Sequence, residues 1–136
     1  MKKGEFIEKI KIAAREVGAR HSLRLMVLYG SHAKGMAKKN SDVDIAVLGE
    51  KALDLGQITD IINEFMDLLK INEVDVKSLH KTNPLFRWEV MERGILLYGD
   101  ELDFVKFRAY AFRDYVDSKS LFDLKEKMVK KQIKNL

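Results

Sequence analysis

The chain has 136 residues, of which 46% are hydrophobic and 34% are charged, and its formal net charge is +4. This length suits one domain with one core, and no apolar run approaches the roughly 20 residues that span a bilayer. Cysteine is absent, which excludes disulfides, thiolate metal ligands and cysteine nucleophiles. The N-terminal segment alternates charged and apolar residues and lacks a signal-peptide core, so we expect a soluble cytoplasmic protein with no membrane association.

Hydrophobic periodicity predicts alternating helices and strands along most of the chain. Gly18, Asn83-Pro84 and Gly94 supply stop and start signals for the helices. In chain order, the predicted elements are a helix over 3–20, a strand over 23–29, a short helix over 32–37, a strand over 43–47, a helix over 57–70, a strand over 73–79, a helix over 84–94 and a short edge strand over 95–98.

The C-terminal part of the chain is predicted to be helical from Glu101, with Ser118-Lys119-Ser120 interrupting it before a last helix. Its lysine-rich end is more typical of a solvated helix face than of a nucleic-acid-binding surface, so no nucleic-acid partner is expected. The aromatic residues of this region exceed what one buried helix face needs, so some should be exposed at a partner surface: Phe104, Phe107, Tyr110, Phe112 and Tyr115.

The order of these elements indicates an α/β domain with a small mixed sheet. We expect a single domain over residues 1–136, with a core near 20–100 and C-terminal helices over 101–136. Phe86 and Trp88, on the helix after Pro84, are expected to belong to the core rather than to a nucleobase platform.

Two acidic residues, Asp42 and Asp44, stand at the start of the predicted strand over 43–47. Because they are two residues apart on a strand, both side chains project from one face, roughly 7 Å apart. Such acids repel each other unless a cation lies between them, and carboxylate oxygens suit Mg²⁺. Asp75, between two valines on the next predicted strand, is expected to join them. Three aspartates on adjacent strands can hold two divalent ions about 4 Å apart and so promote displacement at phosphorus.

A glycine-serine turn precedes these acids. Gly30 follows a buried strand and precedes a short helix, so an anion can approach the backbone N–H groups there. Ser31 adds a hydroxyl donor, and Lys34 adds a cation within one helical turn. This part of the chain therefore predicts a seat for phosphate groups.

Each of these residues also has a plainer structural interpretation. Asp42 and Asp44 could begin a strand after a turn, and Asp75 could lie on the surface of an edge strand. Ser31 could cap a helix, and Lys34 could be solvated. The fixed spacing of the whole set favours the metal and phosphate interpretation.

That spacing reproduces a known signature. Gly30-Ser31, ten further residues and Asp42-x-Asp44 match the GSx₁₀DxD pattern of the DNA polymerase beta-like nucleotidyltransferases. The stretch from Gly30 to Ile45 resembles the GSxARG…SDxDL motif of the minimal nucleotidyltransferase (MNT) group. Members of this group are small prokaryotic proteins, often paired with an all-helical HEPN protein in toxin–antitoxin modules. The resemblance covers residues 20–100.

The resemblance implies a polymerase beta-like fold in which Gly30 and Ser31 bind the triphosphate of the donor, with ATP the expected nucleotide. Lys34 stands where the family often has arginine. Lysine keeps the positive charge but loses the bidentate fork, so we expect phosphate binding to survive.

The resemblance also implies two Mg²⁺ ions. Asp42 and Asp44 would ligate both ions, and Asp75 would complete one site and help to activate the acceptor hydroxyl. These three aspartates are therefore the expected catalytic residues and metal ligands.

The acceptor is expected to be a protein. Larger relatives carry an additional domain for the acceptor, whereas only about 35 residues follow Asp100 here. We therefore expect the acceptor site to be shared with another chain, either in a homo-oligomer or with a HEPN-type toxin that is adenylylated on a hydroxyl, with tyrosine the favoured residue. The alternatives are a non-catalytic antitoxin that masks its partner and transfer to a small molecule such as an aminoglycoside.

Overall fold

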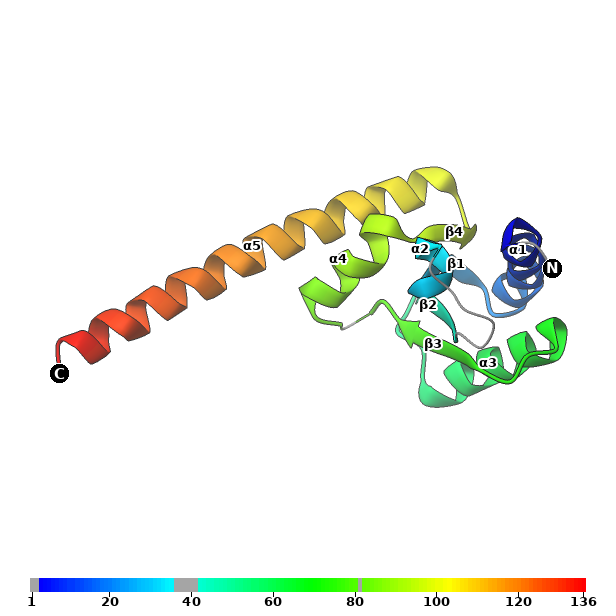
Figure 1. Cartoon of the computed structure of the whole chain (residues 1–136), viewed down its shortest axis with the longest axis horizontal. Coiled ribbons are helices and arrows are strands. Elements are labelled where there is room, and N and C mark those ends of the chain that lie inside the picture. Colours follow the sequence, from blue (N-terminus) through cyan, green and yellow to red (C-terminus); the bar gives the residue numbers. More distant parts are fainter. Residues whose placement is uncertain (1–2, 36–41, 81) are drawn as a thin grey trace.

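A computed structural model describes residues 3–35, 42–80 and 82–136 of the chain. Five helices and four strands form a mixed α/β fold in this part, as the periodicity predicts (Figure 1). In chain order they are α1 (Lys3–Arg20), β1 (Leu23–Tyr29), α2 (Ser31–Lys34), β2 (Val43–Gly49), α3 (Leu55–Leu69), β3 (Val74–Ser78), α4 (Pro84–Arg93), β4 (Ile95–Tyr98) and α5 (Glu101–Lys134).

The four strands form one mixed sheet in the order β3-β2-β1-β4. β1 pairs antiparallel with both β2 and β4, which places β4 at the predicted edge. β2 and β3 are parallel, and α3 is the crossover between them. Because β1 runs against β2, the end of β1 lies beside the start of β2, and the start of β3 lies next to them.

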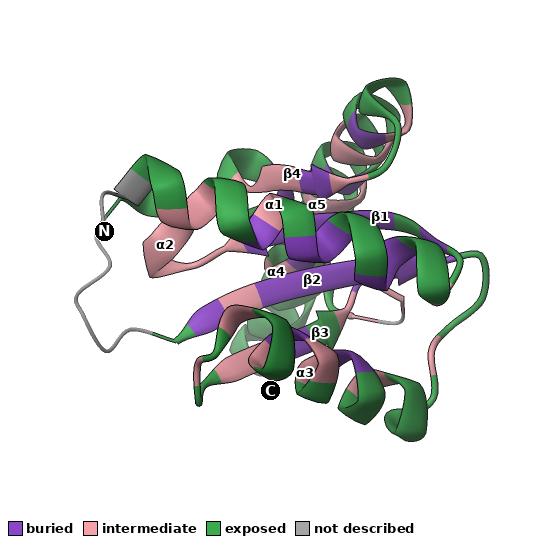
Figure 2. Ribbon diagram, turned by 90° about the vertical axis from the view of Figure 1, so that its right-hand side faces the viewer, coloured by how far each residue is buried: buried purple, intermediate pink, exposed green. Residues whose placement is uncertain are grey.

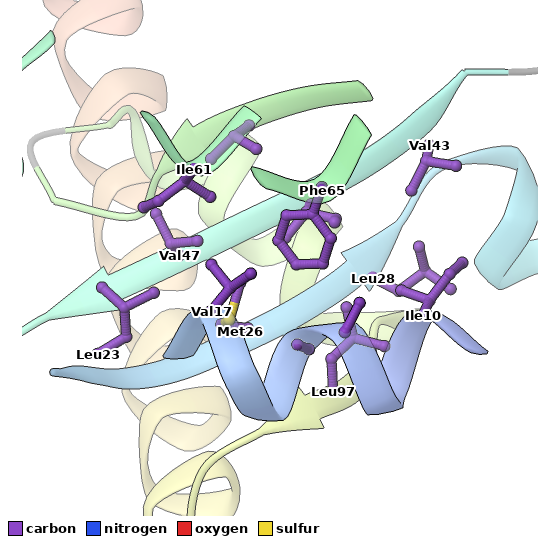
Figure 3. Packing of buried hydrophobic residues seen from close by; sticks show 14 residues of the cluster. Ile10, Val17, Leu23, Met26, Leu28, Val43, Val47, Ile61, Phe65 and Leu97 are labelled. Carbon is purple, nitrogen blue, oxygen red and sulfur yellow. The ribbon is translucent and has the colours of Figure 1, made fainter. Parts of the chain in front are cut away.

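Helices cover both faces of the sheet, and each face has its own core. α1 and α3 lie over one face (Figure 2), and Figure 3 shows their apolar side chains meeting alternate residues of the central strands. The main residues of this core are Ile10, Val17, Leu28, Val43, Val47, Ile61 and Phe65. α4 and α5 cover the other face, where the buried residues include Leu25, Val27, Ala46, Val90, Met91, Phe104 and Ala111. Phe86 and Trp88 pack against this second core, as expected.

Local capping sets where α3 and α4 begin. The Asp54 side chain accepts from the Gln57 N–H at 2.8 Å, and the Gln57 side chain accepts from the Asp54 N–H at 3.2 Å. This capping box starts α3 at Leu55, two residues before the predicted start. Asn83 caps α4 by accepting from the Phe86 N–H, with proline at the first helical position as predicted.

The short helix α2 ends earlier than predicted. It stops at Lys34, because Gly35 adopts a left-handed conformation with φ of 77° that terminates the turn. The rest of the predicted helix, to Ala37, and the following polar loop with Ser41 fall outside the described residues.

The predicted break at Ser118-Lys119-Ser120 is wrong: α5 is one continuous helix from Glu101 to Lys134. Serine and lysine cost only a few tenths of a kcal/mol in an exposed helix, and no glycine or proline stands there. The last third of α5 extends beyond the other elements (Figure 1). Within the described part of the chain, no helix is both long and apolar enough to cross a membrane.

Candidate active site

Two of the predicted metal ligands lie side by side. Asp44 on β2 and Asp75 on β3 are register partners in the parallel pair, so their side chains project from the same face on strands about 4.8 Å apart. Both residues are half-buried. They alternate with valines and isoleucine of the first core, so they belong to the face that α4 and α5 cover.

The electrostatic environment of Asp44 is unfavourable to its charge. Burial raises the pKa of its carboxyl above the ordinary value, and the negative charges of Asp75 and Asp42 raise it further. The positive charges of Lys77 and His32 offset part of this rise. A bound cation would stabilise the ionised form of carboxylates that are half-buried and close to one another.

The third predicted ligand, Asp42, pairs with an acid that the sequence analysis missed. Asp42 directly precedes β2, Glu73 directly precedes β3, and the Val43 N–H donates to the Glu73 carbonyl at 3.2 Å. A hydrogen bond to Asp42, together with its negative charge, raises the pKa of Glu73. Asp-x-Asp on one strand therefore faces Glu-x-Asp on the next. The two-residue spacing between Glu73 and Asp75 is the signal that could have revealed this pairing.

The four carboxylates form two pairs along the strands rather than one cluster. Within residues 3–35, 42–80 and 82–136, no three acidic or histidine side chains converge into a preformed metal site. Asp42 and Glu73 directly precede the paired strands β2 and β3, whereas Asp44 lies beside Asp75 within them. All donors are carboxylate oxygens, the ligands that a hard divalent cation such as Mg²⁺ prefers. The donor set thus fits such a cation, while the three-ligand geometry stays a prediction.

Gly30 brings the backbone against this acidic pair. Its φ of 77° and ψ of −154° lie in a region open essentially to glycine alone. A Cβ atom at this position would overlap the Asp44 carboxylate. Tyr29, the preceding residue, is the register partner of Asp44 on β1. The turn at Gly30 therefore places the start of α2 next to the carboxylates.

The two other predicted phosphate-binding residues lie on the single helical turn that follows. Ser31 is the first residue of α2 and is half-buried, and Lys34 is its last residue and is exposed. The Lys34 N–H donates to the Gly30 carbonyl at 3.1 Å, which closes the turn. The structure thus places Gly30 against Asp44 and puts Ser31 and Lys34 on the helical turn that follows.

An aromatic pair forms the wall of the site on the side of α4. The Tyr29 and Phe86 ring centroids are 5.6 Å apart in an edge-on arrangement. Lys77 Nζ lies 5.5 Å from the Phe86 centroid and 3.9 Å from Asp75 Oδ2. Burial and the charges of Asp44 and Asp75 raise the pKa of the Tyr29 phenol.

A cavity of about 400 Å³ lies between α2 and α4, a volume typical of small-molecule sites. Its walls combine the aromatic pair with cationic and acidic groups: Tyr29, Gly30, Lys34, Phe86, Glu89, Val90, Glu92 and Arg93. Phe86, expected only in the core, therefore also lines this cavity. Arg93 was not singled out from the sequence, because a basic residue in a last helical turn is common.

Known proteins resemble the chain in sequence and fold. The protein adenylyltransferase MntA of Shewanella oneidensis is 31% identical over 81 residues, which are 60% of this chain and 58% of that relative. The matched region thus spans less than two thirds of the relative. A chain from a toxin–antitoxin crystal structure with AMP-PNP has a TM-score of 0.74 at 24% identity, covering 89% of this chain and 97% of the other.

A second solved structure, of tri-AMPylated Shewanella oneidensis HEPN toxin in complex with MNT antitoxin, gives a TM-score of 0.70 at 22% identity. This match covers 94% of the present chain and 98% of the other. At such identities these structures show a shared fold. The sequence itself is more specific, because residues 8–103 match the model of the family described as Polymerase beta, Nucleotidyltransferase. The chain therefore belongs to the polymerase beta nucleotidyltransferase family.

Proposed function

We propose that the chain is a metal-dependent protein adenylyltransferase that moves AMP from ATP to a hydroxyl group of a HEPN-type toxin and so acts as its antitoxin. The observation that carries the proposal is the register pairing of Asp44 with Asp75 beside Gly30, because it joins a carboxylate pair to a phosphate-binding turn. The name of the Shewanella oneidensis relative supports the choice of reaction. Cytoplasmic ATP and Mg²⁺ would supply donor and metal.

Asp42 and Asp44 would hold two Mg²⁺ ions, with Asp75 completing one site. Metal ions held there would neutralise charge that develops on the transferring phosphate. Asp75 also accepts the proton of the acceptor hydroxyl, whose oxygen bonds to the α-phosphorus. The bond from that phosphorus to the bridging oxygen breaks, and pyrophosphate leaves towards Ser31 and the start of α2.

The cavity between α2 and α4 supplies a place for the rest of the donor. Lys34 and Arg93 line it with two cations that could meet phosphate, beside the acids Glu89 and Glu92, and Phe86 offers an aromatic surface for a nucleobase. Lys77 lies between Phe86 and Asp75, where its charge limits repulsion between the acids and a polyphosphate. These contacts support a nucleoside triphosphate as the donor.

The partner rests on the comparisons. The solved chains of similar fold come from toxin–antitoxin complexes, one of them with a tri-AMPylated HEPN toxin. We extend this partner to the present chain as part of the proposal, with a tyrosine hydroxyl as the favoured acceptor.

The test uses ATP labelled at its α-phosphate and measures transfer of the label to a HEPN-type protein in the presence of Mg²⁺. The double variant Asp42→Ala/Asp44→Ala should lose transfer by roughly 100-fold or more, since even residues behind metal ligands cost about 10- to 100-fold. Asp60→Ala/Asp67→Ala is a matched control, because it removes two exposed aspartates from α3. Equal labelling by the acid-site variant and the control would contradict the proposal.

The rival function is a non-catalytic antitoxin that masks its partner. The observation that favours it is that no three acidic side chains converge into a preformed metal site within the described residues. Calorimetry separates the two functions without any partner. Mg²⁺-dependent ATP binding that is lost in Asp42→Ala/Asp44→Ala supports the transferase. ATP binding that does not depend on Mg²⁺ supports the non-catalytic antitoxin.

A further inference from the structure

The last part of α5 is a helix without neighbours. Near the middle of α5, Phe112 lies with its ring 5.0 Å from that of Trp88 on α4, and Asp114 pairs with Arg87 on α4 at 2.9 Å. Every residue from Lys119 to Leu136 is exposed. We name residues 117–136 the projecting segment, which is about 30 Å long and leaves the body beyond α4 (Figure 1).

The projecting segment carries an apolar face that matches the buried face of α5. Phe122 and Val129 follow the buried residues Phe104 and Ala111 by 18 residues each, which is about five helical turns. Phe122, Val129, Ile133 and Leu136 therefore lie on the side of the helix that packs on the body further up, whereas Leu121, Leu124 and Met128 lie round the helix from that side. The exposed apolar residues of this segment are Leu121, Phe122, Leu124, Met128, Val129, Ile133 and Leu136, each more than half exposed. An apolar surface of this extent indicates a protein interface.

Charge along the projecting segment is unevenly distributed. Its first half, residues 117–126, holds all three acids of the segment, Asp117, Asp123 and Glu126, with two lysines. Its second half, residues 127–136, has four lysines and no acid. Two parallel copies would bring these lysines together, whereas two antiparallel copies bring the acidic half of each against the basic half of the other.

We propose that the projecting segment binds a second copy of the chain as an antiparallel helix pair, with its two-fold axis near Met128 and Val129. In this register Leu121 of one copy meets Leu136 of the other, and Met128 meets Val129. In this register, the numbers of two residues that face each other across the helix pair add up to about 257.

Residues beside the central contact of Met128 with Val129 also match across the two helices. Phe122 lies opposite Ile133, so apolar meets apolar twice by symmetry. Glu126 pairs with Lys130 of its own helix at 3.4 Å, and in this register the pair lies beside its symmetry copy. Lys125 faces Gln132, and its aliphatic stem can lie along the apolar seam. In this register Leu136 of each copy lies beside Leu121 of the other, so the paired residues all belong to the projecting segment. The pairing therefore leaves α4 and the acidic site of both copies free, and it does not depend on the proposed function.

The mass of the full chain in solution is the first test. Sedimentation should give twice the 15.7 kDa of one chain. Leu121→Asp should shift the species to 15.7 kDa, whereas Ser120→Asp should leave the dimer, since it adds the same charge to the neighbouring residue on the polar face. Circular dichroism checks that both variants keep the helix. A wild-type chain that stays at 15.7 kDa, including one that dimerises only with a different protein, would overturn the proposal.

Single cysteines test the direction of the pair, because the chain has none of its own. Met128→Cys should form an intermolecular disulfide, since the two sulfurs lie near the axis. Leu121→Cys alone should not, because its copies would be about 22 Å apart along the helix. An equal mixture of Leu121→Cys and Leu136→Cys should form a mixed disulfide. Rapid oxidation of Leu121→Cys alone would indicate parallel helices and contradict the proposal.

Discussion

The absence of a side chain at Gly30 lets the backbone turn directly against the Asp44 carboxylate. Its backbone conformation is one that other residues reach only at a cost of order 1–3 kcal/mol, and its neighbour in space is the Asp44 carboxylate. Gly30→Ala should therefore lower the free energy of unfolding by about that amount and abolish Mg²⁺-dependent ATP binding. Thermal unfolding and calorimetry measure the two effects. Gly4→Ala is the control, because a Cβ there meets open space, and similar losses in both variants would contradict this role for Gly30.

Asp44 gives the site a pH dependence of defined sign. Its folded-state pKa is raised by burial and by the nearby acids, so the folded chain holds that proton more tightly than the unfolded chain does. Above the folded pKa, ionised Asp44 therefore costs stability. As the pH falls through that pKa towards the unfolded value, this cost disappears.

Without divalent metal, Asp44→Asn should be more thermally stable than the wild type near pH 7, and the difference should shrink as the pH falls. Melting temperatures measured from pH 7 to pH 4 in a chelator check this. Adding Mg²⁺ should raise the melting temperature of the wild type more than that of the variant. A variant that is less stable than the wild type at neutral pH would show that the ionised Asp44 carboxylate does not destabilise the folded chain.

At the scale of the elements, the sequence predicted the strands and most helices because each has a clear period or cap. The continuous apolar run of β1 and the proline at the start of α4 are local signals, and both elements match their predicted ranges closely. α5 was predicted in two pieces because polar residues were taken as a break, although only glycine or proline would have supplied one. The start of α3 depended on a reciprocal cap between Asp54 and Gln57, which is equally local and could have been found.

The candidate site was less predictable, because its pairings depend on register between strands. The spacing from Gly30 to Asp44 is a feature of the sequence, but the position of Asp75 opposite Asp44 is a property of the folded sheet. Tyr29 and Phe86 meet only when α4 crosses the end of β1, so no local pattern marks them. Which carboxylates share a cation cannot be deduced from spacing alone.

At the scale of the whole molecule, one buried cation holds the second helical layer in place. Arg87 on α4 is only 8% exposed and donates to the carbonyls of Leu79 and Thr82, each at 3.3 Å. It also donates to Asp114 on α5 at 2.9 Å and lies over the Tyr110 ring. A single guanidinium on α4 thus joins Leu79, directly after β3, to Thr82 and to α5. The active-site cavity has α4 as one wall, so its shape depends on this attachment.

Arg87→Ala should therefore be far more damaging than an ordinary surface change. Breaking a buried ion pair by removing one partner costs about 3–5 kcal/mol, a large share of the roughly 5–15 kcal/mol that stabilises a typical domain. Arg113→Ala, an exposed arginine next to Asp114, should stay within about 0.5 kcal/mol of the wild type. Urea unfolding of both variants measures the difference, and ATP affinity should fall in Arg87→Ala because Phe86 and Val90 move with α4. Comparable small losses in the two variants would mean that apolar packing alone attaches α4 and α5 to the sheet.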